Sequence, residues 1–235
     1  MILGLDTATA GTAAAVWAPD GPAVERRDDP PPGQRPAHAG RLLVLVEEAL
    51  AAAGAGWAQI ERIAVGVGPG GFTGLRLGIA TARGLAQANE IPLVGVSSLR
   101  ALAVAAADDP ARAAESPAGA AGVEAEGARA VVAVIDARRG EVFALAQGRF
   151  GPLAIAPQAL ANKLQPGMLA VGDGAVRFRA ELERAGVVVP VDSSPLHRVS
   201  ALQICRLGAA GEAADRDALL PDYRREPDAT PRTLQ

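Results

Sequence analysis

Cysteine and lysine are almost missing from this chain of 235 residues. Cys205 is the single cysteine, so the chain forms no internal disulfide and lacks the ligands of a cysteine-based metal site. Lys163 is the single lysine, the net charge is -3, and no dense block of basic residues occurs. Binding of nucleic acid by this chain alone is therefore disfavoured, although a patch of arginines can add to a surface shared with a partner.

Histidine and long apolar runs are scarce too. His38 and His197 are the only histidines, and a two-histidine metal site on the helix that begins near His38 would need its second ligand at Leu42. No apolar run approaches the roughly 20 residues of a membrane span, and the start MILGLDT has no basic segment before a long apolar stretch. We therefore expect a cytoplasmic protein with no metal, no membrane partner and no signal peptide.

The chain does contain enough apolar material for a sizeable core, since 49% of its residues are hydrophobic. The spacing of these residues predicts an α/β protein in which strands come first and then alternate with helices. The predicted strands are 1–6, 12–17, 23–28, 63–68, 93–96, 131–136, 141–147, 153–156 and 168–172, and the predicted helices are 38–53, 72–89, 98–107, 157–165, 175–185 and 200–214.

Two segments share one plan of apolar strand, aspartate, short turn, glycine and apolar strand: LGLDTATAGTAAAVW at 3–17 and AVIDARRGEVFALA at 133–146. This repeat predicts two similar halves with ligand space between them. A stretch poor in large apolar residues, 108–128, reads as a flexible linker or insertion. We expect the last helix to pack back on the first half. The predicted division is 1–103, 104–128 and 129–235.

The stretch VGVGPGGFTGLRLGIATA at 65–82 comes close to two phosphate-binding loops. Gly66, Gly68 and Gly71 satisfy G-x-G-x-x-G between a strand and a helix, but no acidic residue ends the next strand to hold a ribose. The P-loop spacing is also present, but the lysine that would reach the terminal phosphates is absent. We therefore favour a packing role, in which a tight turn precedes a face of small residues that lets another helix approach closely. These small residues are Gly74, Gly78 and Ala82.

Asp6 and Asp136 end strands at matching places in the two halves. In a nucleotide-handling cleft they would orient a metal-bound water or a hydroxyl. Alternatively, each stabilises its own turn by accepting hydrogen bonds from backbone N–H groups. A strand-to-helix glycine turn in the second half is of a kind that can admit an adenosine. The candidate lining of such a cleft consists of Asp6, Thr7, Asp136, Arg138, Gly172, Asp173 and Gly174.

Five segments occur in order along the chain: ILGLDTAT at 2–9, GPGGFTGLRLG at 68–78, PLVGVSSL at 92–99, IDAR with GEV at 135–142, and PDYRR at 221–225. Together they resemble the TsaB family, formerly YeaZ, the dimerisation subunit of the bacterial machinery that makes threonylcarbamoyladenosine in tRNA. The resemblance covers nearly the whole chain apart from the insertion. The chain departs from the family pattern at Gly71, where serine is more usual, and at Arg224, where an apolar residue is common.

This resemblance implies the fold of the actin-like and sugar-kinase-like ATPases, with two similar halves that each contain a mixed sheet flanked by helices. It also implies a catalytic sister subunit, TsaD, which transfers a threonylcarbamoyl group from an adenylate to the adenosine beside the anticodon of tRNAs that decode ANN codons. TsaD carries two metal-binding histidines at positions that correspond here to Ser98 and Leu102, and neither residue holds iron or zinc as histidine does. The chain is therefore expected to be non-catalytic and to bind no cofactor.

By the same resemblance, the chain pairs with TsaD, takes up the small ATPase TsaE, forms a homodimer when alone and meets tRNA only through the complex. The helix at 38–53 is apolar all round and the helix at 74–89 has a small-residue face, so the two suit a four-helix contact. Alternatively, both helices only cover the chain's own sheet. The expected contact residues are Leu42, Leu45, Val46, Gly74, Leu75, Gly78, Ile79 and Ala82.

Two other functions stay open on the sequence. A small-molecule kinase or ATPase would use Asp6, Asp136 and the glycine turn at 172–174, and would turn over nucleotide with magnesium by itself. A metallopeptidase, the older label of the sister family, is disfavoured by the missing histidine pair.

Overall fold

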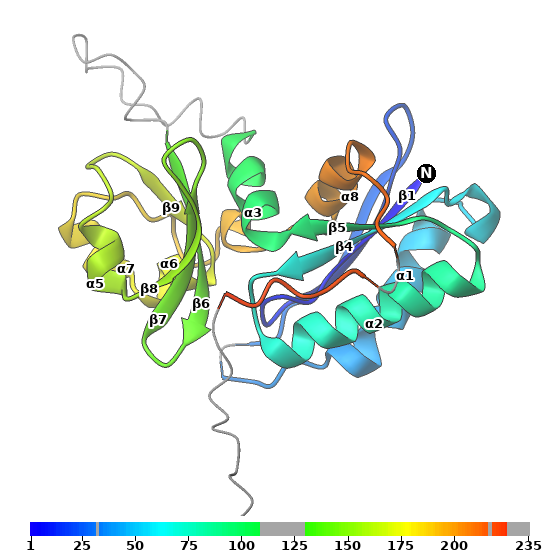
Figure 1. Cartoon of the computed structure of the whole chain (residues 1–235), viewed down its shortest axis with the longest axis horizontal. Coiled ribbons are helices and arrows are strands. Elements are labelled where there is room, and N and C mark those ends of the chain that lie inside the picture. Colours follow the sequence, from blue (N-terminus) through cyan, green and yellow to red (C-terminus); the bar gives the residue numbers. More distant parts are fainter. Residues whose placement is uncertain (32, 109–129, 216–217, 225–235) are drawn as a thin grey trace, which may run out of the picture.

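The first half of the chain is built on a mixed five-stranded sheet of order β3-β2-β1-β4-β5 (Figure 1). A computed structural model describes residues 1–31, 33–108, 130–215 and 218–224, so the predicted insertion lies, apart from residue 108, outside the described part. The β1–β2 and β2–β3 pairs are antiparallel, and the β1–β4 and β4–β5 pairs are parallel. The strands are β1 (Ile2–Asp6), β2 (Thr12–Trp17), β3 (Ala23–Asp28), β4 (Arg62–Gly68) and β5 (Leu93–Ser97).

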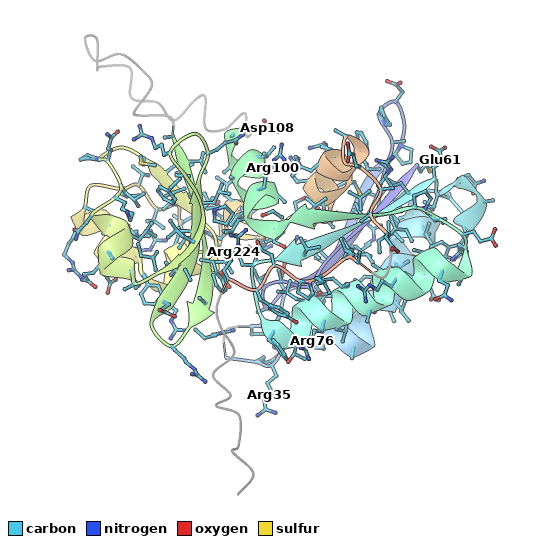
Figure 2. All side chains as sticks on the ribbon, viewed as in Figure 1. Arg35, Glu61, Arg76, Arg100, Asp108 and Arg224 are labelled. Atoms are coloured by element: carbon cyan, nitrogen blue, oxygen red, sulfur yellow. The ribbon has the colours of Figure 1, made fainter. Side chains whose placement is uncertain are left out.

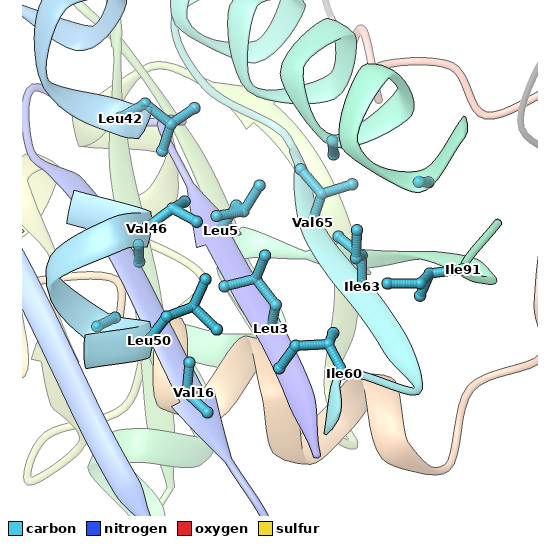
Figure 3. Close-up of a cluster of buried hydrophobic side chains, with 14 of the residues drawn as sticks. Leu3, Leu5, Val16, Leu42, Val46, Leu50, Ile60, Ile63, Val65 and Ile91 are labelled. Carbon is cyan, nitrogen blue, oxygen red and sulfur yellow. The ribbon is translucent and has the colours of Figure 1, made fainter. Parts of the chain in front are cut away.

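Alternation along the strands decides which helices cover which face of this sheet. Ala14 and Val16 of β2 point into a core with α1 (His38–Ala52) and α2 (Phe72–Ala88). Ala13 and Ala15 point the other way, where they pack against Cys205 of α8 (Ala201–Ala209). Figure 3 shows the first of these cores between the sheet and its two helices. The sheet is therefore covered on one face by helices that are near in sequence and on the other by a helix from the far end of the chain.

The second half contains a four-stranded mixed sheet of order β8-β7-β6-β9. The β6–β7 and β7–β8 pairs are antiparallel and the β6–β9 pair is parallel, which repeats the plan of β3-β2-β1-β4 in the first half. Its elements are β6 (Val131–Arg138), β7 (Glu141–Ala146), β8 (Phe150–Ile155), α5 (Pro157–Ala161), β9 (Leu169–Val171), α6 (Asp173–Arg177) and α7 (Arg179–Arg184).

Two elements connect the halves. Helix α3 (Ser98–Ala107) contributes Leu99 and Leu102 to a core that also contains Ile135 and Phe143 of the second sheet. The Glu25 carboxylate of β3 accepts hydrogen bonds from the Ser200 hydroxyl (2.8 Å) and the Ala201 N–H (3.2 Å) at the start of α8. Two short 3₁₀ turns, η1 (Trp57–Gln59) and η2 (Pro195–His197), complete the described elements.

The predicted α/β architecture with two similar halves is confirmed, and the main differences lie in the later helices. Helix α5 ends at Ala161, ahead of Pro166, where a longer helix was predicted. The helix predicted at 175–185 is divided into α6 and α7 at Phe178. Helix α8 ends at Ala209, where the chain turns. The Arg62 guanidinium donates hydrogen bonds to the carbonyl groups of Gly208, Ala209 and Gly211 at this end of the helix. Among the described residues, no helix has both the length and the apolar character needed to cross a membrane.

Two glycines of α2 give a matched test of the packing under this helix. A Cβ on Gly74 would clash with the Thr7 carbonyl oxygen, whereas a Cβ on Gly84 would meet nothing within 4 Å. We expect Gly74→Ala to lower the free energy of unfolding by about 1–3 kcal/mol, since the β1–β2 turn must move. Gly84→Ala should raise it by about 0.5–1 kcal/mol through better helix propensity. Urea unfolding measures both, and equal stabilities for the two variants would contradict this packing.

Candidate functional site

A cleft of about 320 Å³ lies where the two halves meet. The first half lines it with the β1–β2 turn at 9–11 and with Arg27 and Asp29, and the second half lines it with Asp173, His197 and Arg198. Of the seven residues expected to line a cleft, the structure brings only Asp173 to this wall. The other six are placed in separate networks around it.

The cationic side chains of the cleft are paired with carboxylates. Arg27 forms ion pairs with Glu25 (2.6 Å) and Asp29 (3.0 Å), and Arg198 forms one with Asp29 (3.4 Å). Burial would lower the pKa of Arg27, but its hydrogen bonds and charge interactions with Asp29 and Glu25 outweigh this effect and raise it. Phosphate groups would therefore have to displace existing partners from these guanidinium groups.

Asp6 is buried at the end of β1 and is not one of the residues that line the cleft. Its carboxylate accepts hydrogen bonds from the Ala8 N–H (3.0 Å) and the Ser98 hydroxyl (2.7 Å). Burial raises the pKa of Asp6 to about 6, and the hydrogen bonds from Ser98 and Ala8 oppose that rise. Thr7, the next residue, donates its hydroxyl to the Gly74 carbonyl (2.8 Å). Both side chains thus hold the β1–β2 turn against β4, α2 and α3, which is the turn-stabilising alternative.

The corresponding turn of the second half is held in a similar way. The Asp136 carboxylate forms ion pairs with Arg177 (2.8 Å) and Arg138 (3.2 Å) and accepts the Arg138 N–H (2.9 Å). The Asp173 carboxylate accepts the Asp136 N–H (3.0 Å), and burial raises the pKa of Asp173 to about 6. A Cβ on Gly174 would lie 2.9 Å from the Asp136 nitrogen, so this glycine is required by the close approach of two backbone segments.

The two histidines are also used internally. The His197 Nδ1 accepts the Gly172 N–H (3.1 Å), so the proton resides on Nε2, which donates to the Pro190 carbonyl (3.1 Å). The His38 Nδ1 lies 2.8 Å from the Thr12 hydroxyl oxygen. Burial lowers the pKa of both rings, which favours neutral imidazoles in structural roles.

Ser98 and Leu102, the two positions expected by resemblance to correspond to a histidine pair in TsaD, have structural contacts in this chain. Ser98 donates to Asp6, and Leu102 is fully buried with its Cδ2 2.7 Å from where a Cβ of Gly172 would lie. Within the described part of the chain, no group of three or more histidine, cysteine, aspartate and glutamate side chains could hold a metal ion.

The glycine-rich stretch packs against the β1–β2 turn. A Cβ on Gly66 would clash with the Asp6 carboxylate, and one on Gly70 would clash with the Ala8 carbonyl oxygen. The Gly71 N–H donates to that same oxygen (2.7 Å), so it is not directed at a phosphate. Within this chain the glycines serve close packing, and the element that lies against Gly74 and Gly78 is the β1–β2 turn, through Thr7, where a helix was expected.

The eight residues expected at a partner interface lie inside this chain's own fold. All are buried, most of them in the core between the first sheet and its helices. This agrees with the alternative in which the two helices cover their own sheet, and it leaves the outer faces of α1 and α2 exposed. The large apolar side chains exposed there are Leu43 (51%), Val44 (38%) and Phe72 (53%).

A short segment near the end of the chain reaches the start of α2. Tyr223 in this segment is 45% exposed and stacks on Phe72. Its motif was included in the family resemblance, but periodicity gives no signal for an irregular segment that docks far away in sequence. The exposed positions on α1 had a readable signal, because five consecutive apolar residues at 42–46 cannot all face one side of a helix.

Comparison with known proteins places these features in a family. Residues 31–164 match the family model described as "TsaD: tRNA N6-adenosine threonylcarbamoyltransferase". The chain is 37% identical over 142 residues to the tRNA threonylcarbamoyladenosine biosynthesis protein TsaB of Escherichia coli, a match that covers 60% of this chain and 52% of the relative. The matched region therefore spans about half the length of this curated relative.

Two further similarities extend over nearly the full chain. An uncharacterized protein of Mycobacterium tuberculosis, Rv3421c, is 33% identical over 237 residues, with 98% of this chain and 94% of the relative covered. The solved structure of YeaZ from Pseudomonas aeruginosa superposes with a TM-score of 0.70 at 28% identity and covers 94% of this chain and 98% of that one. The similarity thus includes both halves.

The buried Asp6 carboxyl predicts a specific pH dependence. Its pKa is 3.8 in the unfolded chain and about 6 in the folded one, so the folded state binds more protons between these values. The stability contributed by this residue is fully present below pH 3.8 and is lost as the pH rises through 6. We expect Asp6→Asn, whose amide can satisfy both Ala8 and Ser98, to be more stable than the parent by on the order of 1–3 kcal/mol at pH 7.5.

That advantage should disappear at pH 4, where the parent carboxyl is largely protonated when folded. Urea unfolding at the two pH values measures it, with the exposed Asp20→Asn as the control that should show no such change. A constant difference between Asp6→Asn and the parent across this range would contradict the burial of an acid.

Proposed function

The chain belongs to the TsaB/YeaZ family, and from this membership we propose that it is the non-catalytic scaffold subunit for threonylcarbamoyl modification of the adenosine next to the anticodon in ANN-decoding tRNAs. In this proposal it acts in the cytoplasm as the partner of the catalytic subunit TsaD, and the pair takes up the ATPase TsaE. The chain meets tRNA only within that complex and forms a homodimer when alone.

The observation that best supports the non-catalytic role is that the carboxylates expected in a working cleft are bound to other groups of the same chain. Asp6 is bound to Ser98 and to backbone, and Asp136 is bound to Arg138 and Arg177. A general base or metal ligand needs a lone pair directed at substrate or metal, and these oxygens are directed at the protein. The position of Ser98, where TsaD has a histidine by resemblance, supports the same role.

The outer faces of α1 and α2 support the scaffold role. Leu43 and Val44 on α1 and Phe72 on α2 are exposed, while the neighbouring apolar residues are buried under them. The two helices form the outer layer on one face of the first sheet (Figure 1). The TsaD family model matches a region that contains both helices, so a TsaD subunit would present equivalent helices to them.

A kinase or ATPase that acts alone is the second candidate, and the cleft of about 320 Å³ favours it. Its adenosine-binding turn would be the one at Gly172, where the φ angle of 111° is open to glycine. Against it stands the pairing of the cleft arginines with Glu25 and Asp29. Hydrolysis of ATP by the purified chain with magnesium, abolished by Asp173→Asn, would favour this candidate.

Reconstitution tests the scaffold proposal directly. We expect purified TsaD, TsaE, the adenylate-forming enzyme, ATP, threonine, bicarbonate and tRNA to yield threonylcarbamoyladenosine only when this chain is added. The modified nucleoside is measured by mass spectrometry of digested tRNA. An equal yield without the chain would refute the scaffold role.

A charge on the outer face of α1 tests the location of the partner. Leu43→Glu places a carboxylate on a side chain that is 51% exposed, and Val191→Glu places one at a 71% exposed site in the second half as the control. We expect the first to weaken TsaD binding at least about tenfold, since a charge must then be desolvated in the contact, and the second to change it less than about twofold. Sedimentation or calorimetric titration measures both. Equal effects of the two variants would place the contact elsewhere.

A further inference from the structure

Three side chains from two distant parts of the chain form a stack at the start of α2. The Phe72 and Tyr223 rings lie 5.5 Å apart between centroids with an interplanar angle of 28°. The Arg76 guanidinium, one turn along α2, lies 3.8 Å from the Phe72 centroid. Its Nε donates a hydrogen bond to the Tyr223 hydroxyl (2.8 Å). These three residues are called the aromatic stack below.

The segment that carries Tyr223 is fixed to the first half at several points. The Asp222 N–H donates to the Val67 carbonyl (2.8 Å), and Arg83 of α2 donates to the Leu219 carbonyl. The Leu219 side chain lies 2.6 Å from where a Cβ of Gly95 would be, so it occupies space that only a glycine leaves open. The aromatic stack is therefore held in one arrangement before any partner arrives.

The aromatic stack is fixed but not covered. Phe72 is 53% exposed and Tyr223 is 45% exposed. Arg76 lies at the surface beside the start of α2 (Figure 2) and forms no ion pair with a carboxylate among the described residues. Its Nε is used by Tyr223, which leaves the outer N–H groups for a carboxylate from outside the chain. Aromatic and arginine side chains with little entropy left to lose are the residues that dominate binding energy at protein interfaces.

We propose that the aromatic stack is an anchor by which this chain binds its TsaD partner. This rests on the scaffold function proposed above and adds the residues and the chemistry of the contact. The stack is continuous with the outer face of α2, and the chemistry it fits is an apolar pocket edged by an aspartate or glutamate. The TsaD family match stops at residue 164, so Tyr223 belongs to a part of the chain outside that match. In this proposal Tyr223 therefore makes this chain's side of the contact differ from the TsaD side.

An RNA base is the other flat group that an exposed aromatic pair could receive, and the geometry disfavours it. Stacking of a base needs an open ring face, but the Arg76 guanidinium covers the Phe72 ring at 3.8 Å and Tyr223 stacks on the same ring. The adjacent Arg224 is paired with Asp222 (2.6 Å), so it adds little positive charge for a phosphate. The surface therefore suits a polypeptide with its own carboxylate.

Binding of TsaD to the full chain, measured by calorimetry, tests the anchor with four variants. Tyr223→Ala and Arg76→Gln should each weaken binding about tenfold or more. Tyr223→Phe keeps the ring and loses only the hydroxyl that positions Arg76, so a loss of about two- to threefold is expected. The control is Val191→Ala, which removes an apolar group that is 71% exposed from the second half and should leave the affinity unchanged.

The outcomes separate the two proposals. If the parent chain does not bind TsaD, the scaffold function fails and the anchor fails with it. If the parent binds and Tyr223→Ala and Arg76→Gln bind equally well, only the anchor is overturned. The anchor is also overturned if Tyr223→Ala and Arg76→Gln bind TsaD normally but lose self-association. The same holds if they bind TsaD normally but lose binding to an anticodon stem-loop RNA, measured by fluorescence anisotropy. Arg76→Gln keeps α2 intact, so an unfolded Tyr223→Ala variant would not end the test.

Discussion

The fold depends on the close packing of the β1–β2 turn against the strand, loop and helix that carry the glycines. Asp6, Thr7 and Ala8 each occupy a space where a side chain on β4, α2 or the loop between them would otherwise stand, and each makes a hydrogen bond. A turn that buries a carboxylate needs partners for both oxygens, since an unpaired buried acid is costly. Ser98 and the backbone supply those partners, so α3 is fixed to the same point. The starting positions of α2 and α3 thus follow from one turn.

The second half repeats this device with different side chains. Asp136 lies near the end of β6 as Asp6 does at the end of β1, but its oxygens are paired with the exposed arginines Arg138 and Arg177. The glycine that admits the turn is Gly174, which lies against the Asp136 nitrogen as Gly66 lies against Asp6. The duplicated plan therefore repeats the same turn geometry in both halves, and in both turns the aspartate is bound by groups of the protein itself.

Much of the fold could be predicted from the sequence because local period and composition determine it. The hairpins, the repeat of the two halves and the helices at α1, α2 and α3 all have strong local signals. The end of α8 involves a tertiary contact, since Arg62 of β4 binds the carbonyl groups there, and no local pattern contains that contact. The site was harder still. The rotation of α1 about its axis decides which apolar residues are buried and which are exposed. An apolar run on every side of a helix does not specify that rotation, so the sequence could not show that Leu42, Leu45 and Val46 are buried while Leu43 and Val44 are exposed.

The position of α8 has a consequence for how the chain is made. The face of the first sheet to which Ala13 and Ala15 point is covered by a helix that follows the entire second half in the sequence. On the ribosome, the N-terminal sheet must therefore wait with that face bare while about a hundred more residues emerge, at a typical pace of about 5–20 residues per second. The first half is therefore one structural unit in the finished fold, but it cannot be completed until the second half has been synthesised.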